Sequence, residues 1–370
     1  MDALIMSCGT GGGHNAAGAA IAEELRLRGH NATMINPYSL CSNKAEHIID
    51  NIYISIVKTF PGLFGLIYRL GNLYRRLPFQ SPVYHLNRLM QKNIQAYLKE
   101  HPADIIIMPH LFPAEIITAM KNSGIYSGIS VFVATDYTCI PFTEETDCDY
   151  YIIPSDDLKD EYIKRGVPEE KLMPFGIPCR SDFSASYSKA DAKKSLGLDE
   201  NKKYILISGG SMGAGKVSLA IKILHDFFRH DKSVCFIVIC GSNKKLYSYI
   251  NRHYSDNVIP VKFTRDIAKY MKACDIFISK PGGLSSTEAL VSGIPLIHIS
   301  PIPGCETHNM NYFSQKGYCV PVKKIYKELI PAINLLLNSS TDFAADRPHA
   351  DATKNICSFC EKLVMSKKPD

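Results

Sequence analysis

Short apolar runs alternate with longer amphipathic segments along most of the chain. The runs are continuously apolar and rich in β-branched side chains, as is typical of parallel strands covered by helices on both faces. The predicted strands are residues 3–7, 31–36, 104–109, 129–134, 149–153, 204–208, 234–240, 258–261, 275–279, 295–300 and 318–321. The predicted helices are residues 14–28, 113–122, 157–165, 214–230 and 285–292. This alternation predicts an α/β protein with doubly wound sheets and right-handed crossovers.

The alternation stops between Gly176 and Asn201, so we expect two domains. This segment is polar and has no strand pattern, and 370 residues exceed one typical domain. We expect an N-terminal Rossmann-like domain over residues 1–178, a C-terminal one over 179–340, and a tail with one helix over 341–370. Ligands of such sheets bind at the carboxyl ends of the strands, so we expect the active site in a cleft that the two domains face.

The composition is that of an ordinary soluble enzyme, with 46% hydrophobic and 21% charged residues. No apolar run approaches the ~18–20 residues of a membrane-spanning helix. The N-terminus has no charged region or cleavage site of a signal peptide, so we expect a reducing cytosol. The twelve cysteines are then expected to be buried thiols. This includes the Cys-x-x-Cys of Cys357 and Cys360, which has no second pair to complete a metal site.

One block of the chain is strongly basic. Residues 51–99 contain seven Lys or Arg and no Asp or Glu, within a total net charge of +6. Aromatic side chains are interleaved with these bases. The block is either an ordinary helical insert with an aromatic core, or an element that binds an anionic membrane surface at ~1 kcal/mol per basic group. The absence of acids favours the membrane, and the confinement of the charge to one block argues against nucleic acid.

The glycine-rich segment GGSMGAGKVS, residues 209–218, lies within one residue of an ATPase phosphate loop. Val217 stands where that loop needs a hydroxyl for Mg²⁺, and no strand ends in the carboxylate that such enzymes require. A triphosphatase is therefore disfavoured. Backbone N–H groups around Gly210 and Ser211, with the following helix start, instead predict an anion site, and a glycine turn for packing is the alternative.

A second glycine-rich loop, SCGTGGGH, follows the first predicted strand and ends in His14. A dinucleotide fingerprint needs a small residue in place of His14 and an acid after the second strand, so NAD and FAD are disfavoured. Gly12 and Gly13 leave the backbone bare, so we expect His14 to face the cleft and accept a proton from a hydroxyl. Asp136, at the end of another strand, could orient the histidine, hold a sugar hydroxyl or act as the base itself.

The segment SKPGGLSSTEAL, residues 279–290, combines a strand end, a turn and a helix start. Gly282 and its neighbour allow a ligand to approach the backbone closely. Glu288, expected in the first turn of the helix, suits bidentate bonding to a ribose diol. The next strand is followed by PIPGCETHN, which places Glu306 at a second strand end.

Together, TGGGH, GGS, PGGLSSTEAL and the later PGxExxN resemble glycosyltransferase family 28 over residues 3–335. Within it the chain is most similar to the monogalactosyldiacylglycerol synthases and the processive diacylglycerol glucosyltransferases. The resemblance implies two Rossmann-like domains in the GT-B arrangement and inverting transfer of a hexose from a UDP-sugar to a lipid hydroxyl, diacylglycerol first among the candidates. It also implies a peripheral protein on the cytoplasmic face of the cell membrane, with no cofactor and no catalytic metal.

The resemblance also implies roles for individual residues. His14 matches the family's proposed base, Asp136 its TD-aromatic position, and Glu288 the residue that bonds the ribose hydroxyls. Cys305 departs from the glutamine with which relatives often contact the sugar. The remaining substrate-binding residues implied are Gly12, Gly13, Arg180, Gly210, Ser211, Phe263, Thr264, Gly282, Gly283, Leu284, Ser285, Glu306 and Asn309.

Three other functions stay open at this point. A UDP-N-acetylglucosamine-dependent transferase could use another lipid-linked acceptor. A UDP-sugar epimerase has a similar two-domain fold but needs no membrane element. A non-catalytic nucleotide-binding or membrane-adaptor protein would bind the same ligands without turnover.

Overall fold

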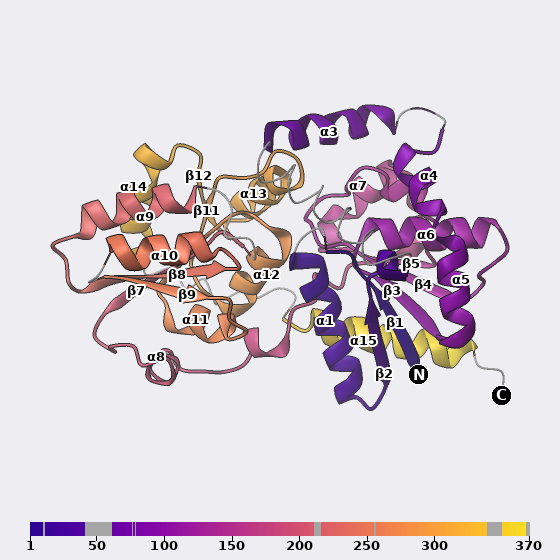
Figure 1. The fold of residues 1–370 in the computed structure, drawn as a ribbon, viewed down its shortest axis with the longest axis horizontal. Coiled ribbons are helices and arrows are strands. Elements are labelled where there is room, and N and C mark those ends of the chain that lie inside the picture. Colours follow the sequence, from indigo (N-terminus) through magenta and orange to yellow (C-terminus); the bar gives the residue numbers. More distant parts are fainter. Residues whose placement is uncertain are drawn as a thin grey trace. The chain divides into compact units, whose positions relative to one another are not determined.

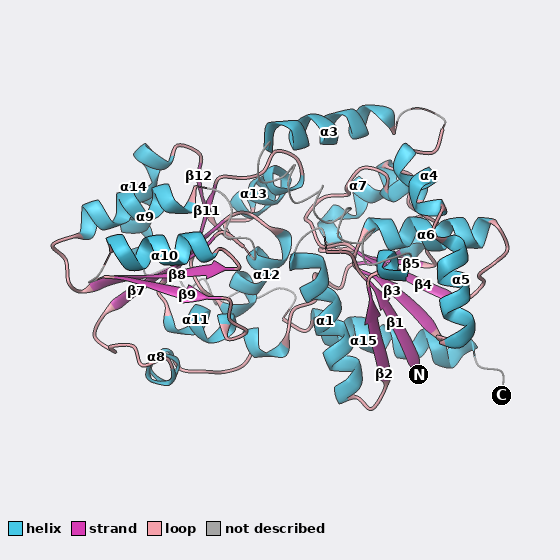
Figure 2. Cartoon of the chain, viewed as in Figure 1, coloured by secondary structure: helices cyan, strands magenta, loops and turns pink. Residues whose placement is uncertain are grey.

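The computed structural model describes residues 1–9, 12–40, 61–75, 77, 79–210, 216–254, 257–338 and 350–367. In the helix that starts at Pro61, side chains are described from residue 68 onward. The chain divides into two compact units. The N-terminal unit consists of Met1–Arg180, Pro303–Cys305 and His349–Asp370, and the C-terminal unit of Ser181–Ile302 and Glu306–Pro348. Each unit is a parallel sheet with helices packed on it (Figures 1 and 2).

The sheet of the N-terminal unit has the strand order β2-β1-β3-β4-β5-β6, and every strand pair is parallel. All residues of β3 and β4 are buried, as expected for strands covered on both faces. The five predicted strands are confirmed, whereas the two-residue β6 is too short to give a periodic signal. The strands are β1 (Asp2–Met6), β2 (Asn31–Ile35), β3 (Ile105–Met108), β4 (Ile129–Val133), β5 (Tyr150–Ile152) and β6 (Leu172–Met173).

The sheet of this unit has helices on both faces, and α3 contacts the loop residue Phe142 instead (Figure 1). The helices are α1 (Gly12–Leu27), α3 (Pro61–Tyr74), α4 (Pro82–Arg88), α5 (Gln91–Glu100), α6 (Leu111–Asn122), α7 (Lys159–Lys164) and α15 (Ala352–Lys367). Helix α15 comes from the C-terminal end of the chain, as predicted for a last helix with no strand to follow. Its Ile356 and Cys360 join the core of the N-terminal unit, and its Glu361 pairs with Arg28 at 3.0 Å and with His30 at 2.8 Å.

The sheet of the C-terminal unit has the order β12-β11-β10-β7-β8-β9, again with every pair parallel. Its strands are β7 (Lys203–Ser208), β8 (Val234–Gly241), β9 (Val258–Lys262), β10 (Ile276–Ser279), β11 (Leu296–Ile299) and β12 (Val320–Val322). Its helices are α8 (Lys189–Ser195), α9 (Val217–Phe228), α10 (Lys244–His253), α11 (Ile267–Ala273), α12 (Gly283–Ser292), α13 (Cys305–Gln315) and α14 (Ile325–Asn338). All six predicted strands are present, the last displaced by two residues.

Two of the displaced helix starts and one additional helix have local reasons. Helix α6 begins two residues early because the side chain of His110 accepts the Phe112 N–H and caps it. Helix α12 also begins two residues early, with Gly282 as its N-cap residue. Helix α8 lies in the segment predicted as a link, and Ser188 caps it by accepting the Asp191 N–H at 3.0 Å.

The cysteines agree with the prediction of buried thiols. Those in the described part of the chain are free, and all but Cys305 are buried. Cys357 and Cys360 lie in the core of the N-terminal unit. Burial raises the pKa of the Cys357 thiol to about 12, so it stays protonated at neutral pH.

Each sheet has one point at which the strand order reverses. It lies between β1 and β3 in the N-terminal unit and between β7 and β10 in the C-terminal unit. At such a switch point the two following loops leave in opposite directions, which opens a crevice at the carboxyl ends of the strands. His14 follows β1 and Gly210 follows β7, while Asp136 follows β4, the neighbour of β3.

Candidate active site

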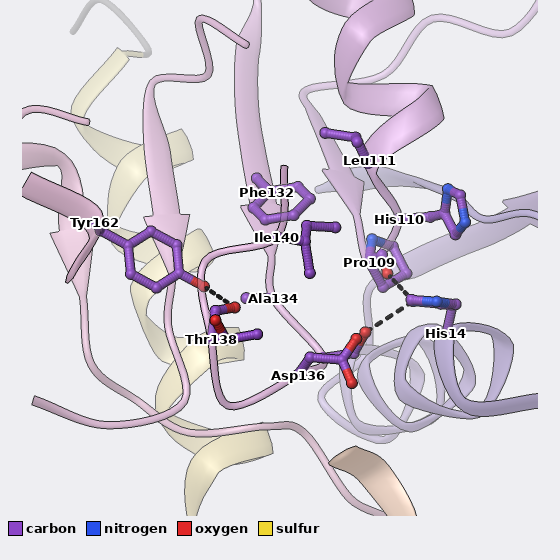
Figure 3. A pocket seen from close by; sticks show the side chains of 11 residues that line it. His14, Pro109, His110, Leu111, Phe132, Ala134, Asp136, Thr138, Ile140 and Tyr162 are labelled. Carbon is purple, nitrogen blue, oxygen red and sulfur yellow. Dashed lines mark hydrogen bonds between the residues drawn. The ribbon is translucent and has the colours of Figure 1, made fainter. Parts of the chain in front are cut away.

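His14 stands at the switch point of the N-terminal unit, on the first turn of α1. Its Nδ1 lies 2.8 Å from the carbonyl oxygen of Pro109, which follows β3 (Figure 3). A carbonyl can only accept, so Nδ1 carries the proton and Nε2 carries the lone pair. The same Nδ1 lies 2.8 Å from Oγ1 of Thr135, the residue before Asp136. The strands β1, β3 and β4 therefore all contribute to the setting of one imidazole.

The electrostatic setting keeps this imidazole neutral. Burial lowers the pKa of His14, while the charge of Asp136 and the Pro109 carbonyl partly oppose that shift. A pKa below the ordinary value of about 6.5 means that Nε2 holds a lone pair at neutral pH. Asp136 would stabilise the imidazolium that forms once His14 has taken up a proton. The site has the properties of a general base.

A small pocket, partly open to solvent, lies in front of these residues. One end is polar and holds His14, Thr135 and Asp136. The rest of the lining is mostly apolar and consists of Pro109, His110, Leu111, Phe132, Ala134, Thr138, Ile140 and Tyr162. Such a pocket suits a hydroxyl group on a largely apolar molecule.

The loop that carries Asp136 is fastened to α7. Glu161 Oε1 accepts the hydroxyl of Thr138 at 2.7 Å and the backbone N–H of Cys139 at 3.1 Å. Arg165 binds the same carboxylate at 2.8 Å and also donates to the Cys139 carbonyl. Asp136 is thus presented by a loop with little freedom, which favours a fixed distance to His14.

In the C-terminal unit, Gly210, Lys280 and Glu306 mark the carboxyl ends of β7, β10 and β11. Lys280 Nζ pairs with Glu306 Oε1 at 2.9 Å, and Glu306 Oε2 accepts the Ile302 N–H at 2.8 Å. Both charged side chains are largely buried, at 12% and 10% exposure. Gly210 has φ +75°, a left-handed conformation that favours glycine, and the Lys280 side chain passes close to it. Lys280 was missed in the sequence, although its place after a strand end was a usable signal.

The turn before α12 is built from the Pro-Gly-Gly segment. Ser285 Oγ donates to the Gly282 carbonyl at 3.2 Å, and buried Asn309 of α13 donates to the Pro281 carbonyl at 3.0 Å. Gly283 and Leu284 are buried in the first turn. The prediction that Glu288 lies in the first turn is wrong, because α12 begins at Gly283 and no acid falls there.

The other predicted residues lie in varied settings. Phe263 is 69% exposed after the edge strand β9, two strands away from β7 in the sheet. Thr264 beside it accepts the Asp266 N–H at 3.0 Å. Arg180 is half-buried at the end of the first stretch of the N-terminal unit, and Ser211 lies outside the described residues. Gly12 is exposed and Gly13 half-buried, both on the first turn of α1.

The structure gives Val217 and Lys216 of the near-match to an ATPase loop no phosphate-binding or metal-binding position. Val217 is buried in the core of the C-terminal unit, where a metal-binding hydroxyl would have to stand, and Lys216 is exposed. Within the residues that the structure describes, no group of three or more His, Cys, Asp or Glu side chains could hold a metal ion. The same described portion holds no helix with the length and apolarity to cross a bilayer.

Solved structures of other proteins identify the fold. The structure is similar to MurG of Acinetobacter baumannii, with a TM-score of 0.63 and 14% identity over 98% of this chain and 99% of that chain. It is similar to the glycotransferase of kitacinnamycin, with a TM-score of 0.64 and 13% identity over 98% of both chains. It also resembles S. aureus MnaA, solved with UDP, with a TM-score of 0.64 and 10% identity over 100% of this chain and 99% of that chain. The fold is therefore the two-Rossmann, GT-B-like fold.

Sequence comparison narrows the class. Residues 14–179 match the family described as monogalactosyldiacylglycerol (MGDG) synthase, and residues 188–354 match glycosyl transferases group 1. The chain is 27% identical to the processive diacylglycerol beta-glucosyltransferase of Bacillus subtilis, over 90% of this chain and 86% of the relative. It is 30% identical to the probable monogalactosyldiacylglycerol synthase 3 of Oryza sativa, over 85% of this chain and 64% of the relative.

The chain is thus a glycosyltransferase. It is similar in sequence to the group of glycosyltransferase family 28 that contains the monogalactosyldiacylglycerol synthases and the processive diacylglycerol glucosyltransferases. The family resemblance of the four sequence motifs is confirmed.

Proposed function

We propose that the chain transfers a hexose from a UDP-sugar to the hydroxyl of diacylglycerol, with inversion at the anomeric carbon, and so makes a membrane glycolipid. The relatives' substrates support this choice. The observation that carries it is the setting of His14, whose Nδ1 is bonded to the Pro109 carbonyl while Nε2 is left as the proton acceptor beside a mostly apolar pocket.

In the proposed reaction the acceptor hydroxyl enters the pocket beside His14. Its oxygen attacks the anomeric carbon from the side opposite UDP, and its proton passes to Nε2. The bond between the anomeric carbon and the diphosphate oxygen breaks, and UDP leaves with the electron pair. Asp136 stabilises the resulting imidazolium.

The leaving diphosphate gains negative charge, which the C-terminal unit can offset. We propose that cations of the chain and helix N-termini do this, without a cofactor or a catalytic metal. Lys280 uses one of its three N–H donors on Glu306 and has further donors for an anion near Gly210. The first turn of α12 presents backbone N–H groups of the kind that bind phosphate.

The proposal is tested by UDP release in the presence of diacylglycerol vesicles and UDP-glucose, UDP-galactose or UDP-N-acetylglucosamine, each in turn. We expect UDP release that requires both the lipid and one of the UDP-hexoses. A UDP-sugar epimerase would convert its substrate without lipid, and an adaptor would bind both ligands without releasing UDP. Release with UDP-N-acetylglucosamine alone among the three sugars, or with none, would overturn the proposed reaction.

We further propose that the protein binds the cytoplasmic face of the cell membrane as a peripheral protein, through the basic block of residues 51–99, called the basic insert below. Six large apolar side chains of residues 70–89 are exposed, at 51% to 73%. They are Leu70, Leu73, Leu77, Phe79, Leu86 and Leu89. Two exposed bases, Arg69 and Arg88, lie beside them in the sequence. Exposed apolar side chains with neighbouring bases are what an anionic lipid surface requires.

Some side chains of the basic insert are buried in the N-terminal unit, as expected for an ordinary helical insert. Tyr84 of α4 is buried, and buried Asn87 bonds both Tyr38 and Glu115. Burial raises the pKa of Glu115 to about 8, so this carboxyl is mostly protonated at neutral pH and acts as a polar anchor for α4. Arg75 pairs with Glu144 at 3.7 Å and so is not a base available to lipid.

Replacing both Leu73 and Leu86 with Glu should weaken binding to anionic vesicles by tenfold or more, because each buried leucine contributes ~1.5–3 kcal/mol and each new carboxylate is repelled. The measurement is co-sedimentation with vesicles that contain anionic lipid. Leu335→Glu is the matched control, since Leu335 is 60% exposed on α14 of the C-terminal unit. An equal loss in Leu335→Glu, or no loss in the double variant, would show that another surface binds the membrane.

A further inference from the structure

His110 is a buried histidine beside His14 that the proposed reaction leaves unused. It follows β3 and precedes α6, and its ring lies 4.5 Å from the ring of His14, centroid to centroid, in an edge-to-face arrangement at 76°. It is 7% exposed and lines the same pocket (Figure 3).

The first contact of His110 determines which of its nitrogens carries the proton. Nδ1 accepts the backbone N–H of Phe112 at 3.1 Å and so caps α6. A nitrogen that accepts an N–H bond holds a lone pair, so the neutral ring carries its proton on Nε2. Burial, and the repulsion between two imidazolium rings that protonation of both histidines would create, hold the pKa of His110 well below its usual range. His110 is therefore a neutral wall of the pocket at neutral pH, with a fixed orientation.

His110 is also connected to His14 through the backbone of the preceding residue. Pro109, whose carbonyl receives the Nδ1 proton of His14, is the residue directly before His110. A cap that fixes His110 therefore also fixes the direction of the Pro109 carbonyl. The ring of His110 also packs edge-to-face against the ring of His14. Both contacts restrain the one imidazole on whose Nε2 the reaction depends.

We propose that His110 is a positioning residue for the His14 base, which holds it in the tautomer and orientation that direct Nε2 into the pocket. The proposal rests on the proposed function of His14. The other groups around His14 are Asp136 and Thr135 from the β4 loop and Tyr162 from α7, which lines the pocket. His110 differs from them because it acts on His14 through both its ring and its cap.

Three variants separate the two contacts. His110→Asn keeps a side-chain acceptor for the cap and removes the ring, His110→Phe keeps a ring and removes the cap, and His110→Ala removes both. We expect kcat to fall ~10- to 100-fold in His110→Ala, with smaller losses in the other two and an unchanged KM for the UDP-sugar. In His110→Ala and His110→Asn, water should enter the space of the lost ring and raise the pKa of His14 toward ~6.5. The acidic limb of the kcat/KM profile should therefore move to higher pH in these two variants.

The tautomer is measured directly by ¹⁵N NMR of the histidine-labelled full chain, without reference to activity. His14 should be protonated on Nδ1 in the parent protein and in His110→Asn, and a mixture of tautomers in His110→Phe and His110→Ala. Ser188→Ala removes a helix cap of the C-terminal unit and should change none of these quantities.

The outcomes are distinguishable. An unchanged His14 tautomer and an unmoved acidic limb in all three variants would overturn the positioning role, whatever the enzyme's reaction. Near-normal turnover after removal of His14 itself would instead overturn its role as the base, and the absence of UDP release with diacylglycerol and each UDP-sugar would overturn the proposed function. If His110→Ala fails to fold, the Asn and Phe variants still decide the question, since each keeps one contact.

Discussion

Replacing His14 with Ala should lower kcat by about 10²- to 10⁴-fold and leave the affinity for UDP unchanged. The expected loss is the typical contribution of a general base in the transition state. Nε2 of His14 is left as the proton acceptor because Nδ1 is 2.8 Å from the Pro109 carbonyl. UDP affinity should be preserved, since Lys280 and the start of α12, which are proposed to bind the diphosphate, belong to the other unit.

The measurement pairs steady-state UDP release with calorimetric titration of UDP. The matched control is His101→Ala, the same substitution at an exposed histidine of the same unit, which should keep full turnover. Near-normal turnover of His14→Ala would assign the base to another group, with Asp136 as the next candidate. A parallel loss of UDP affinity would mean that the substitution damages more than proton transfer.

The strands were predictable from the sequence because they are buried on both faces. Continuous β-branched runs such as Ile105–Met108 and Ile129–Val133 leave little doubt about parallel strands, and their order then places the switch points. His14 could be predicted on the same basis, since it follows β1 at such a point, and Asp136 follows β4, the neighbour of β3. The glycine-rich loop before His14 made its position visible.

His110 and Lys280 were less visible for a physical reason. Each owes its place to a partner far away in the chain, His110 to His14 and Lys280 to Glu306. Local pattern reports which strand a residue follows but not which side chain it will meet. The helix start of α12 was misplaced for a related reason, because a glycine N-cap gives no side-chain signal, and Glu288 was therefore put one turn too early.

Lys280→Met should destabilise the C-terminal unit by about 3 kcal/mol and weaken UDP binding at least tenfold. Removing one partner of a largely buried ion pair leaves the other charge without compensation, which typically costs ~3–5 kcal/mol. Glu306 keeps only its bond to the Ile302 N–H in this variant. The loss of UDP affinity has a separate cause, because the ammonium group next to Gly210 is also the proposed partner of the diphosphate.

The reverse substitution distinguishes the two effects. Glu306→Gln also breaks the pair and should lower stability, but it leaves the Lys280 charge available, so UDP affinity should be kept or increased. The double variant Lys280→Met, Glu306→Gln should recover stability, because no unpaired charge remains, and should not recover UDP affinity. Urea unfolding measures the stability and calorimetric titration the affinity.

Lys269→Met is the matched control, because Lys269 forms an exposed ion pair with Asp266 at 2.9 Å, and such pairs contribute only ~0–1 kcal/mol. Restored UDP affinity in the double variant would show that Lys280 acts only by neutralising Glu306. Unchanged affinity in Lys280→Met would remove the lysine from the nucleotide site altogether. Either result would leave the helix N-terminus at Gly283 as the remaining group proposed to offset the charge of the departing UDP.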